Sequence, residues 1–113
     1  MTKSPHLARL LMLETPIKTS DGAGGYTTTW NGLGQVWAQV LARSARLQSG
    51  ETSPIARNEY RITVRATPVG ADSRPKPGQR FREGLRIYSI TAVSDSDPKG
   101  RYLECYAKEE TAL

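Results

Sequence analysis

The feature that most constrains this chain is a glycine-rich segment followed directly by five strand-forming residues. The segment Asp21-Gly22-Ala23-Gly24-Gly25 supplies the positive φ angles that tight turns require, because glycine adopts them without steric cost. The next residues, Tyr26–Trp30, are all β-branched or aromatic, and such side chains suit a pleated sheet. An apolar segment precedes the turn, so the pattern predicts a β-hairpin with Asp21, Gly22, Gly24 and Gly25 in its turn.

Glycine-rich loops also bind phosphate groups, which is the alternative interpretation of this segment. A P-loop ends in Gly-Lys-Ser or Gly-Lys-Thr, whereas Gly25 is followed by Tyr26. The dinucleotide-binding fingerprint opens a helix, whereas Tyr26–Trp30 strongly favours a strand. The hairpin is therefore the better interpretation, and the sequence predicts no cofactor.

The segment before the turn, Leu7–Lys18, fits either a short helix or a strand when taken alone. Leu7, Leu10 and Leu11 have helical spacing, but Pro16 ends a helix early. The hairpin signal that follows favours the strand.

The rest of the chain contains further extended segments separated by turn residues. The alternation is clearest where Tyr60, Ile62 and Val64 point to one face of a strand, which is typical of a half-buried antiparallel sheet. Glycines at 32 and 34 predict a bend or bulge, and Asp97-Pro98-Lys99-Gly100 predicts a type I turn. The extended segments after the hairpin turn are Tyr26–Trp30, Gln35–Ala42, Asn58–Ala66, Gln79–Phe81, Leu85–Val93 and Arg101–Lys108. The fold prediction is mainly β: a small antiparallel β-barrel or sandwich of five to six strands.

The length of 113 residues predicts one domain with a single core. The stretch 43–57 is polar and lacks alternation, so it is expected to form one long loop with at most one turn of helix at Ser44–Gln48. Residues 1–6 and 109–113 are expected to be flexible ends. No apolar run approaches the length of a membrane-spanning helix, so no membrane partner is predicted, and a single cysteine fits a reducing cytosol.

The net charge of +5 is concentrated in the middle of the chain. Between Arg43 and Arg86 there are ten basic and four acidic residues, against six basic and seven acidic elsewhere. A basic surface attracts phosphate backbones or an acidic protein. The equal alternative is that these arginines are solvated or form subunit contacts.

The sequence lacks the groups that catalysis needs at neutral pH. His6 is the only histidine, which excludes a histidine triad or a multi-histidine metal site. Cys105 has no histidine nearby and is expected to be a small core residue. Asp95 and Asp97 are too few for a calcium site and are expected to form a turn. The sequence therefore predicts no enzyme and no metal.

Several segments taken in order resemble one protein family. They are Leu13-Glu14-Thr15-Pro16, the turn 21–25 with Tyr26, Thr29-Trp30, Val36–Val40, Tyr60–Arg65, Leu85–Ile90 and Leu103-Glu104-Cys105. This order is similar to the head–tail joining proteins, also called head-closure or stopper proteins, of tailed bacteriophages and of phage-derived gene transfer agents. The resemblance covers about residues 7 to 108. One difference is Ala42–Arg46, where the relatives carry a more acidic, helix-prone stretch.

The resemblance implies a structural subunit that forms a ring of about six or twelve copies in the particle neck. Such a ring connects the portal or adaptor protein to the tail terminator or tail tube protein, and helps to close the DNA channel. The particle is assembled in the bacterial cytoplasm. Arg43, Arg46 and Arg57 are then candidates for a loop facing the channel or a neighbouring ring, with Arg61 and Arg65 as a basic strand face. Contact with packaged double-stranded DNA is expected to be non-specific.

Two other functions remain open at this point. A small nucleic-acid-binding β-barrel would use the arginines and stack bases on exposed aromatic rings. A tail-completion or tail-terminator ring protein would share the size and the symmetry.

Overall fold

The computed structural model describes residues 5–43, 59–68 and 70–110. Six strands are found in this part of the chain, and it contains no helix long and apolar enough to cross a membrane. The strands are β1 (Arg9–Ser20), β2 (Tyr26–Ala42), β3 (Glu59–Arg65), β4 (Arg80–Glu83), β5 (Arg86–Asp95) and β6 (Tyr102–Glu110).

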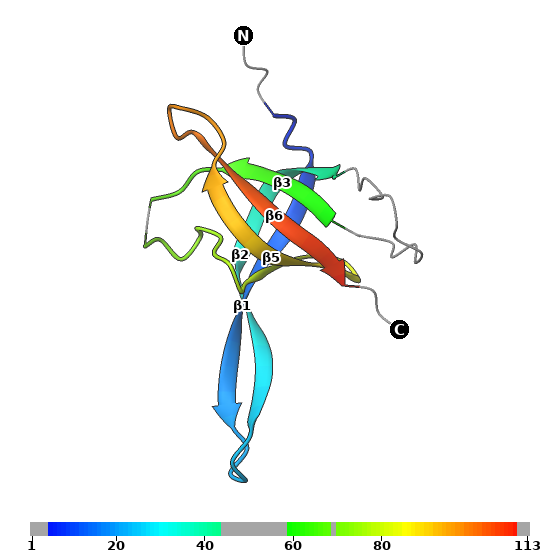
Figure 1. Ribbon diagram of the computed structural model, residues 1–113, viewed down its shortest axis with the longest axis vertical. Coiled ribbons are helices and arrows are strands. Elements are labelled where there is room, and N and C mark those ends of the chain that lie inside the picture. The colour runs from blue at the N-terminus through cyan, green and yellow to red at the C-terminus, as the bar shows by residue number, and fades with distance from the viewer. Residues whose placement is uncertain (1–4, 44–58, 69, 111–113) are drawn as a thin grey trace, which may run out of the picture.

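The six strands form one antiparallel sheet that closes on itself in the order β1-β2-β3-β6-β5-β4 (Figure 1). The closing contact is short, since only Met12, Leu13 and Glu14 of β1 pair with Arg82, Phe81 and Arg80 of β4. Closure removes the free edges that an open sheet would leave unpaired. The predicted fold class is confirmed, and of its two forms the structure has the barrel.

The barrel interior is filled by the inward-facing side chains of all six strands. On β3, Ile62 and Val64 are buried while Arg61 and Arg65 are exposed, as the alternation predicts. The largest fully buried side chains include Tyr88, Phe81 and Leu11. Because the barrel is packed with side chains, it is a solid body rather than a pore.

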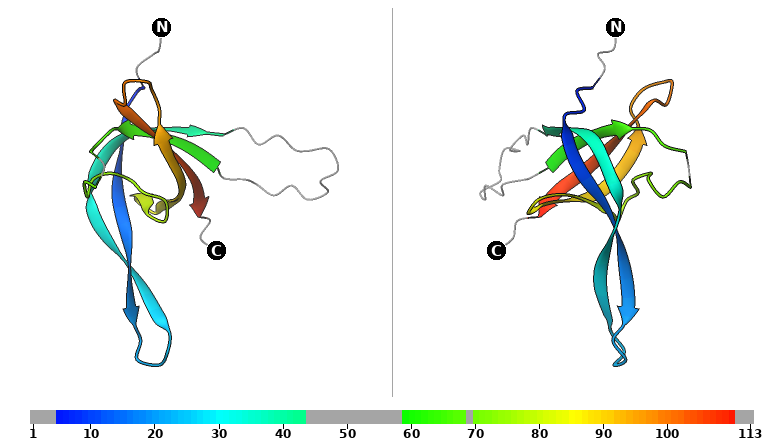
Figure 2. Two further views of the ribbon diagram at one scale, coloured as in Figure 1. Left: turned by 60° about the vertical axis from the view of Figure 1, so that its left-hand side comes forward. Right: turned by 180° about the vertical axis from the view of Figure 1, so that it is seen from behind.

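The hairpin of β1 and β2 extends well beyond the barrel as a twisted two-stranded ribbon (Figures 1 and 2). We call its protruding part, residues 15–31, the arm. Where the arm leaves the barrel the register shifts, because Leu13 pairs with Gly34 and Glu14 with Gly32. Leu33 is therefore the extra residue of a β-bulge, at the position that the glycines predict.

Several segments differ in detail from the sequence expectation. Leu85 lies in the β4–β5 turn with 98% of its surface exposed, rather than opening a strand. Thr63 is buried although it alternates with Ile62 and Val64, and on the outer face of β3 it lines a groove together with Pro5 and His6. The turn at 97–100 forms as predicted, with the Gly100 amide donating to the Asp97 carbonyl at 3.0 Å. The expected helical turn at Ser44–Gln48 lies outside the described residues.

Candidate assembly surfaces

The tip of the arm is ordered by the carboxylate of Asp21. Its Oδ1 accepts hydrogen bonds from the amides of Ala23 at 2.8 Å and Gly25 at 3.0 Å. These bonds lower the pKa of Asp21, because they favour the charged form. Gly22 and Gly24 have φ angles of 79° and 85°, which an L side chain rarely adopts. The predicted turn residues thus shape the arm rather than hold a ligand.

The root of the arm contains a cluster of charged and aromatic side chains. Glu14 is 5% exposed, and its two carboxylate oxygens accept hydrogen bonds from Arg80 Nε at 2.7 Å and Arg82 Nε at 3.0 Å. The Arg80 guanidinium also lies 4.0 Å from the ring centroid of Trp30, a cation–π distance. This root cluster joins β4 of the barrel to both strands of the arm and fixes the direction of the arm.

The cluster at the root was not identified from the sequence. A signal for it exists, because Glu14 interrupts an otherwise apolar strand and Arg80-Phe81-Arg82 places two cations on one face of another. Pairing β1 with β4 requires knowledge of barrel closure, which local patterns do not contain.

The long polar loop begins and ends at residues that the barrel holds in place. The Arg43 amide donates to the Glu59 carbonyl at 2.9 Å. The Arg43 side chain lies 3.9 Å from the Glu59 carboxylate and 4.9 Å from the ring centroid of Tyr106. Both ends of the loop are therefore fixed beside each other. Arg46 and Arg57 lie outside the described residues.

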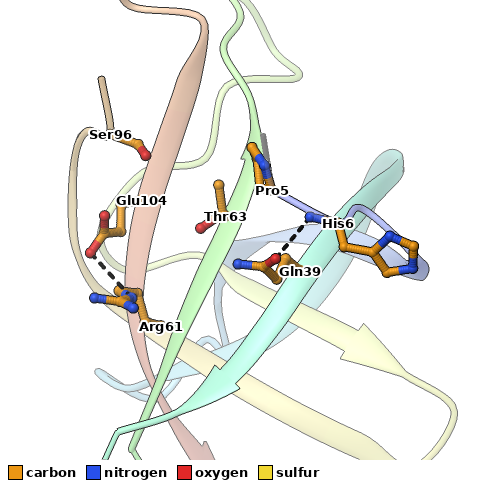
Figure 3. Close-up of a pocket in the computed structure, with 7 residues that line it drawn as sticks. All are labelled: Pro5, His6, Gln39, Arg61, Thr63, Ser96 and Glu104. Atoms are coloured by element: carbon orange, nitrogen blue, oxygen red, sulfur yellow. Dashed lines mark hydrogen bonds and ion pairs between the residues drawn. The ribbon is translucent and has the colours of Figure 1, made fainter. Parts of the chain in front are cut away.

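Arg61 and Arg65 both project from the outer face of β3, but they have different surroundings. Arg61 Nε lies 3.5 Å from Glu104 Oε1, at the rim of a shallow groove of about 480 Å³ (Figure 3). Arg65 lines a second shallow groove with Leu7 and Trp37. The positive charge of Arg61 is thus partly neutralised within the subunit.

The groove at Arg61 has a mixed polar lining. The His6 amide donates to Gln39 Oε1 at 2.8 Å, while the imidazole points away from the groove (Figure 3). The lining residues are Pro5, His6, Gln39, Arg61, Thr63, Ser96 and Glu104. Among them, the hydrogen bond from the His6 amide to Gln39 and the Arg61–Glu104 ion pair link the lining side chains to one another.

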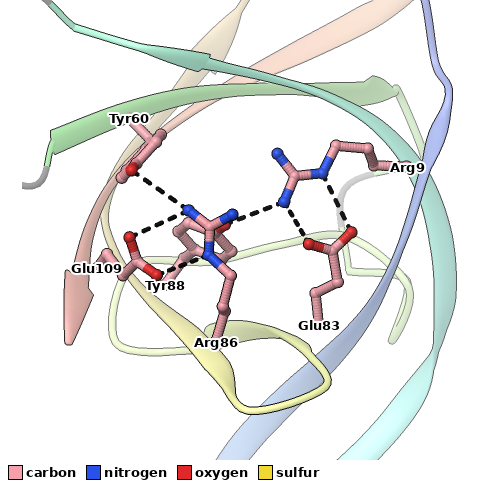
Figure 4. Close-up of polar contacts among 6 residues, drawn as sticks. All are labelled: Arg9, Tyr60, Glu83, Arg86, Tyr88 and Glu109. Atoms are coloured by element: carbon pink, nitrogen blue, oxygen red, sulfur yellow. Dashed lines mark hydrogen bonds and ion pairs between the residues drawn. The ribbon is translucent and has the colours of Figure 1, made fainter. Parts of the chain in front are cut away.

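One end of the barrel is closed by polar side chains that point inward from several strands (Figure 4). Arg86 donates two hydrogen bonds to the Glu109 carboxylate, at 2.7 and 3.1 Å, and one to the Tyr60 hydroxyl at 3.3 Å. The Tyr60 and Tyr88 rings meet edge to face with centroids 5.2 Å apart. Bidentate pairing of this kind fixes geometry as well as charge.

Arg9 completes the closure from the opposite wall. It forms an ion pair with Glu83, which lowers the pKa of that carboxyl group, and donates to the Tyr88 hydroxyl at 3.2 Å. Burial raises the pKa of Tyr88. These hydrogen bonds and ion pairs link strands β1, β3, β4, β5 and β6 at this end of the barrel.

The part of the chain that the structure describes holds no cluster of side chains suited to bind a metal ion. No group of three or more His, Cys, Asp or Glu side chains gathers in residues 5–43, 59–68 and 70–110. Cys105 is fully buried in the core, as expected, and burial raises its thiol pKa to about 12. A thiol with that pKa stays protonated and is a poor nucleophile.

The aromatic side chains differ in how much surface they offer for stacking nucleotide bases, and Tyr26 on the arm is 71% exposed. Phe81 and Tyr88 are fully buried, and Trp30 packs against Arg80. Trp37 is 56% exposed, but it lies beside apolar Leu7 and Leu10 on the outer face. This face has the composition of a protein contact surface, in which tryptophan and arginine are enriched.

Comparisons with known proteins agree with this picture. A family model described as phage head completion protein matches residues 2–110. A chain in a solved structure titled "Virion of native gene transfer agent (GTA) particle" is similar with a TM-score of 0.81 and 48% sequence identity, covering 97% of this chain and 100% of that chain. No curated protein sequence matches.

The closed barrel with its protruding arm thus belongs to a class of structural β-barrel proteins of phage-like particles. The chain belongs to the phage head completion protein family. The family resemblance drawn from the sequence is confirmed.

Proposed function

We propose that this protein is a structural, non-enzymatic subunit of a ring in the neck of a tailed phage-like particle. The ring would connect the portal or adaptor protein to the tail and help to close the DNA channel. The observation that most supports this proposal is the family match over residues 2–110. The 48% identical chain in a gene transfer agent virion supports it as well. In the particle the protein would be found in the neck after assembly in the bacterial cytoplasm.

Because the barrel of each subunit is filled with side chains, the DNA channel would lie between subunits rather than inside one of them. The core of the barrel is packed, and the network around Arg9 and Arg86 links strands at one end. DNA would therefore pass through the centre of a ring of about six or twelve copies. The barrels would form a rigid frame, and the arms and loops would make the contacts.

The segment 43–57 is the proposed channel or inter-ring loop. Arg43 and Glu59, on either side of residues 44–58, are joined by a hydrogen bond at 2.9 Å, so the segment would leave and rejoin the barrel at neighbouring points. Arg43, Arg46 and Arg57 would attract DNA phosphates without reading bases. Arg61 and Arg65 would add to this attraction from the outer face, the former weakened by Glu104.

Deleting the gene in a producing strain tests the proposal. We expect DNA-filled heads and separate tails, with wild-type protein supplied in trans restoring joined particles. Normal joined particles without the protein would contradict the neck assignment. Joined particles with tails of abnormal length would instead support the tail-terminator alternative.

A combined substitution of Arg43, Arg46 and Arg57 by alanine tests the loop separately. We expect particles that join tails but retain less DNA, measured as nuclease-resistant genome per particle. The matched control replaces Lys99 by alanine, because this residue lies in the exposed β5–β6 turn. Equal DNA retention by the two variants would argue against the loop as a channel element.

A further inference from the structure

The β2 strand of the arm has a long edge that no other strand covers within residues 5–43, 59–68 and 70–110. β2 pairs with β3 only over Ala38–Ala42. Before that point, β1 is the only strand that pairs with it, and no turn or loop backbone hydrogen bond within the described residues reaches 26–37. Tyr26 is 71% exposed, and Thr27, Thr28 and Thr29 are exposed as well. An open edge of this kind is a template for another strand.

The alternation of hydrogen-bonded and non-hydrogen-bonded pairs along the arm shows which backbone N–H and C=O groups point outward. The Asp21 amide donates to the Gly25 carbonyl at 3.1 Å, and the antiparallel pattern alternates from that pair along the arm. The pair Lys18–Thr28 therefore has its amide and carbonyl groups pointing outward. The same holds for Tyr26 and Trp30 on β2 and for Pro16 on β1.

The two edges of the arm differ in whether they can accept a strand. On β1 the outward position 16 is proline, which has no N–H, and position 18 is lysine. Proline and lysine on an edge are features that prevent pairing with other chains. The β2 edge, Tyr26–Trp30, has neither proline nor charge and consists of strong strand formers. One edge is blocked and the other is open.

We propose that the open β2 edge of the arm binds an extended segment of a different protein of the particle by β-strand addition. This inference rests on the proposed neck function. In a ring, copies related by rotation would bring β2 of one arm toward β1 of the next, and that edge is the blocked one. The occupant is therefore a strand from another chain, four to six residues long, uncharged and free of proline where it meets the edge.

The root cluster orients the β2 edge before a partner binds. Glu14 accepts hydrogen bonds from Arg80 and Arg82, and Trp30 packs under Arg80. The arm is therefore held in one direction before a partner arrives. Preorganisation of this kind reduces the entropy lost on binding.

Thr28→Pro is the decisive variant, because it removes an outward N–H and leaves the pairing within the arm intact. The matched control is Lys18→Pro, which introduces the same residue directly opposite on the blocked edge. Thr28→Val is a second control that changes the side chain and keeps the N–H. Circular dichroism and thermal melting of each purified variant verify that the barrel is folded.

The readout is the amount of each variant in particles from a strain that lacks the gene, measured by immunoblot of purified particles. We expect wild type, Lys18→Pro and Thr28→Val to incorporate equally, and Thr28→Pro to fall by about tenfold or more. Equal incorporation of Thr28→Pro, or equal loss of both proline variants, would overturn the inference. Failure of wild type itself to enter particles would instead refute the neck function.

Sedimentation of the purified protein tests the identity of the occupant. We expect wild type and Thr28→Pro to sediment identically, because the β2 edge does not bind a second copy. Self-association of wild type that Thr28→Pro abolishes would make the occupant another copy of this chain and overturn the assignment to a different protein.

Discussion

The barrel and the arm share strands β1 and β2, yet the two regions differ sharply in how far their side chains are buried. Within the barrel, Leu11 and Leu13 of β1 are at most 1% exposed. A few residues further along the same strand, Ile17 is 44% exposed, and its neighbour strand carries Tyr26 at 71%. Residues of this hairpin can therefore form a strand without being buried in the core. The barrel holds the buried core, whereas the side chains of the arm are largely exposed.

An isolated two-stranded ribbon is marginally stable in water, so the arm depends on the barrel for its order. It continues the β1–β2 ladder without interruption except for the bulge at Leu33. The root cluster adds ion pairs between Glu14, at the base of the arm, and β4, and a contact of Arg80 with Trp30 of the arm itself. Changes in the barrel should therefore affect global unfolding, whereas changes in the arm should affect local opening.

The largest expected effect comes from emptying the barrel core. Phe81 is fully buried on the short strand that closes the barrel. Phe81→Ala should lower the free energy of unfolding by about 3–5 kcal/mol, measured by urea denaturation. Tyr26→Ala is the matched arm variant and should change it by less than about 0.5 kcal/mol. Similar losses in the two variants would remove the distinction between the two regions.

A smaller effect is expected where the two regions meet. Glu14→Gln leaves two guanidinium groups without their carboxylate, and Arg80 is only 15% exposed. We expect a loss of about 2–3 kcal/mol, because an uncompensated buried charge remains.

The control for the root cluster is Glu59→Gln, which removes an exposed ion pair with Arg43. Its effect should stay below about 1 kcal/mol. Both are measured by urea denaturation, with amide exchange in the arm as a second readout. An unchanged stability of Glu14→Gln would show that the root is not a structural link.

The sequence predicted the local features of both regions. The hairpin, the bulge near Gly34 and the alternation around Ile62 all depend on neighbouring residues, and all three are in the structure. The burial of Cys105, which was expected to be a small core residue because no histidine lies near it in the sequence, is also found in the structure.

What could not be predicted depends on contacts between distant segments. Glu14 and Arg80 are 66 residues apart, and Arg9 and Glu83 are 74 residues apart. Only barrel closure through β1 and β4 brings these pairs together, and no local period encodes that closure. The exposure of the arm could likewise not be predicted from the sequence, because a buried strand and an exposed ribbon can have the same β propensity.

A third prediction concerns the tip of the arm. Gly24 has a φ of +85° with no atom within 4 Å of an added Cβ, so alanine there meets backbone strain alone. Gly24→Ala should cost about 1–2 kcal/mol, expressed as faster amide exchange in the arm. The melting temperature of the barrel should not change. A lowered melting temperature would show that the arm and the barrel unfold together.

The smallest effect is expected from acid, and it is confined to the tip. The amides of Ala23 and Gly25 lower the pKa of Asp21 in the folded arm. Because the folded pKa lies below the ordinary value of 3.8, the charged carboxylate stabilises the turn above that value. The stabilisation is lost as pH falls through the lowered folded pKa.

NMR titration of the Gly25 amide measures this loss directly. Its resonance should shift with a midpoint below 3.8, while core amides such as that of Ile62 stay constant through the same range. Asp21→Asn keeps a side-chain oxygen that accepts from the same amides but does not titrate, so its Gly25 resonance should not respond to pH. A midpoint at or above 3.8 would mean that the carboxylate does not order the tip in solution. The glycines alone would then have to maintain the turn.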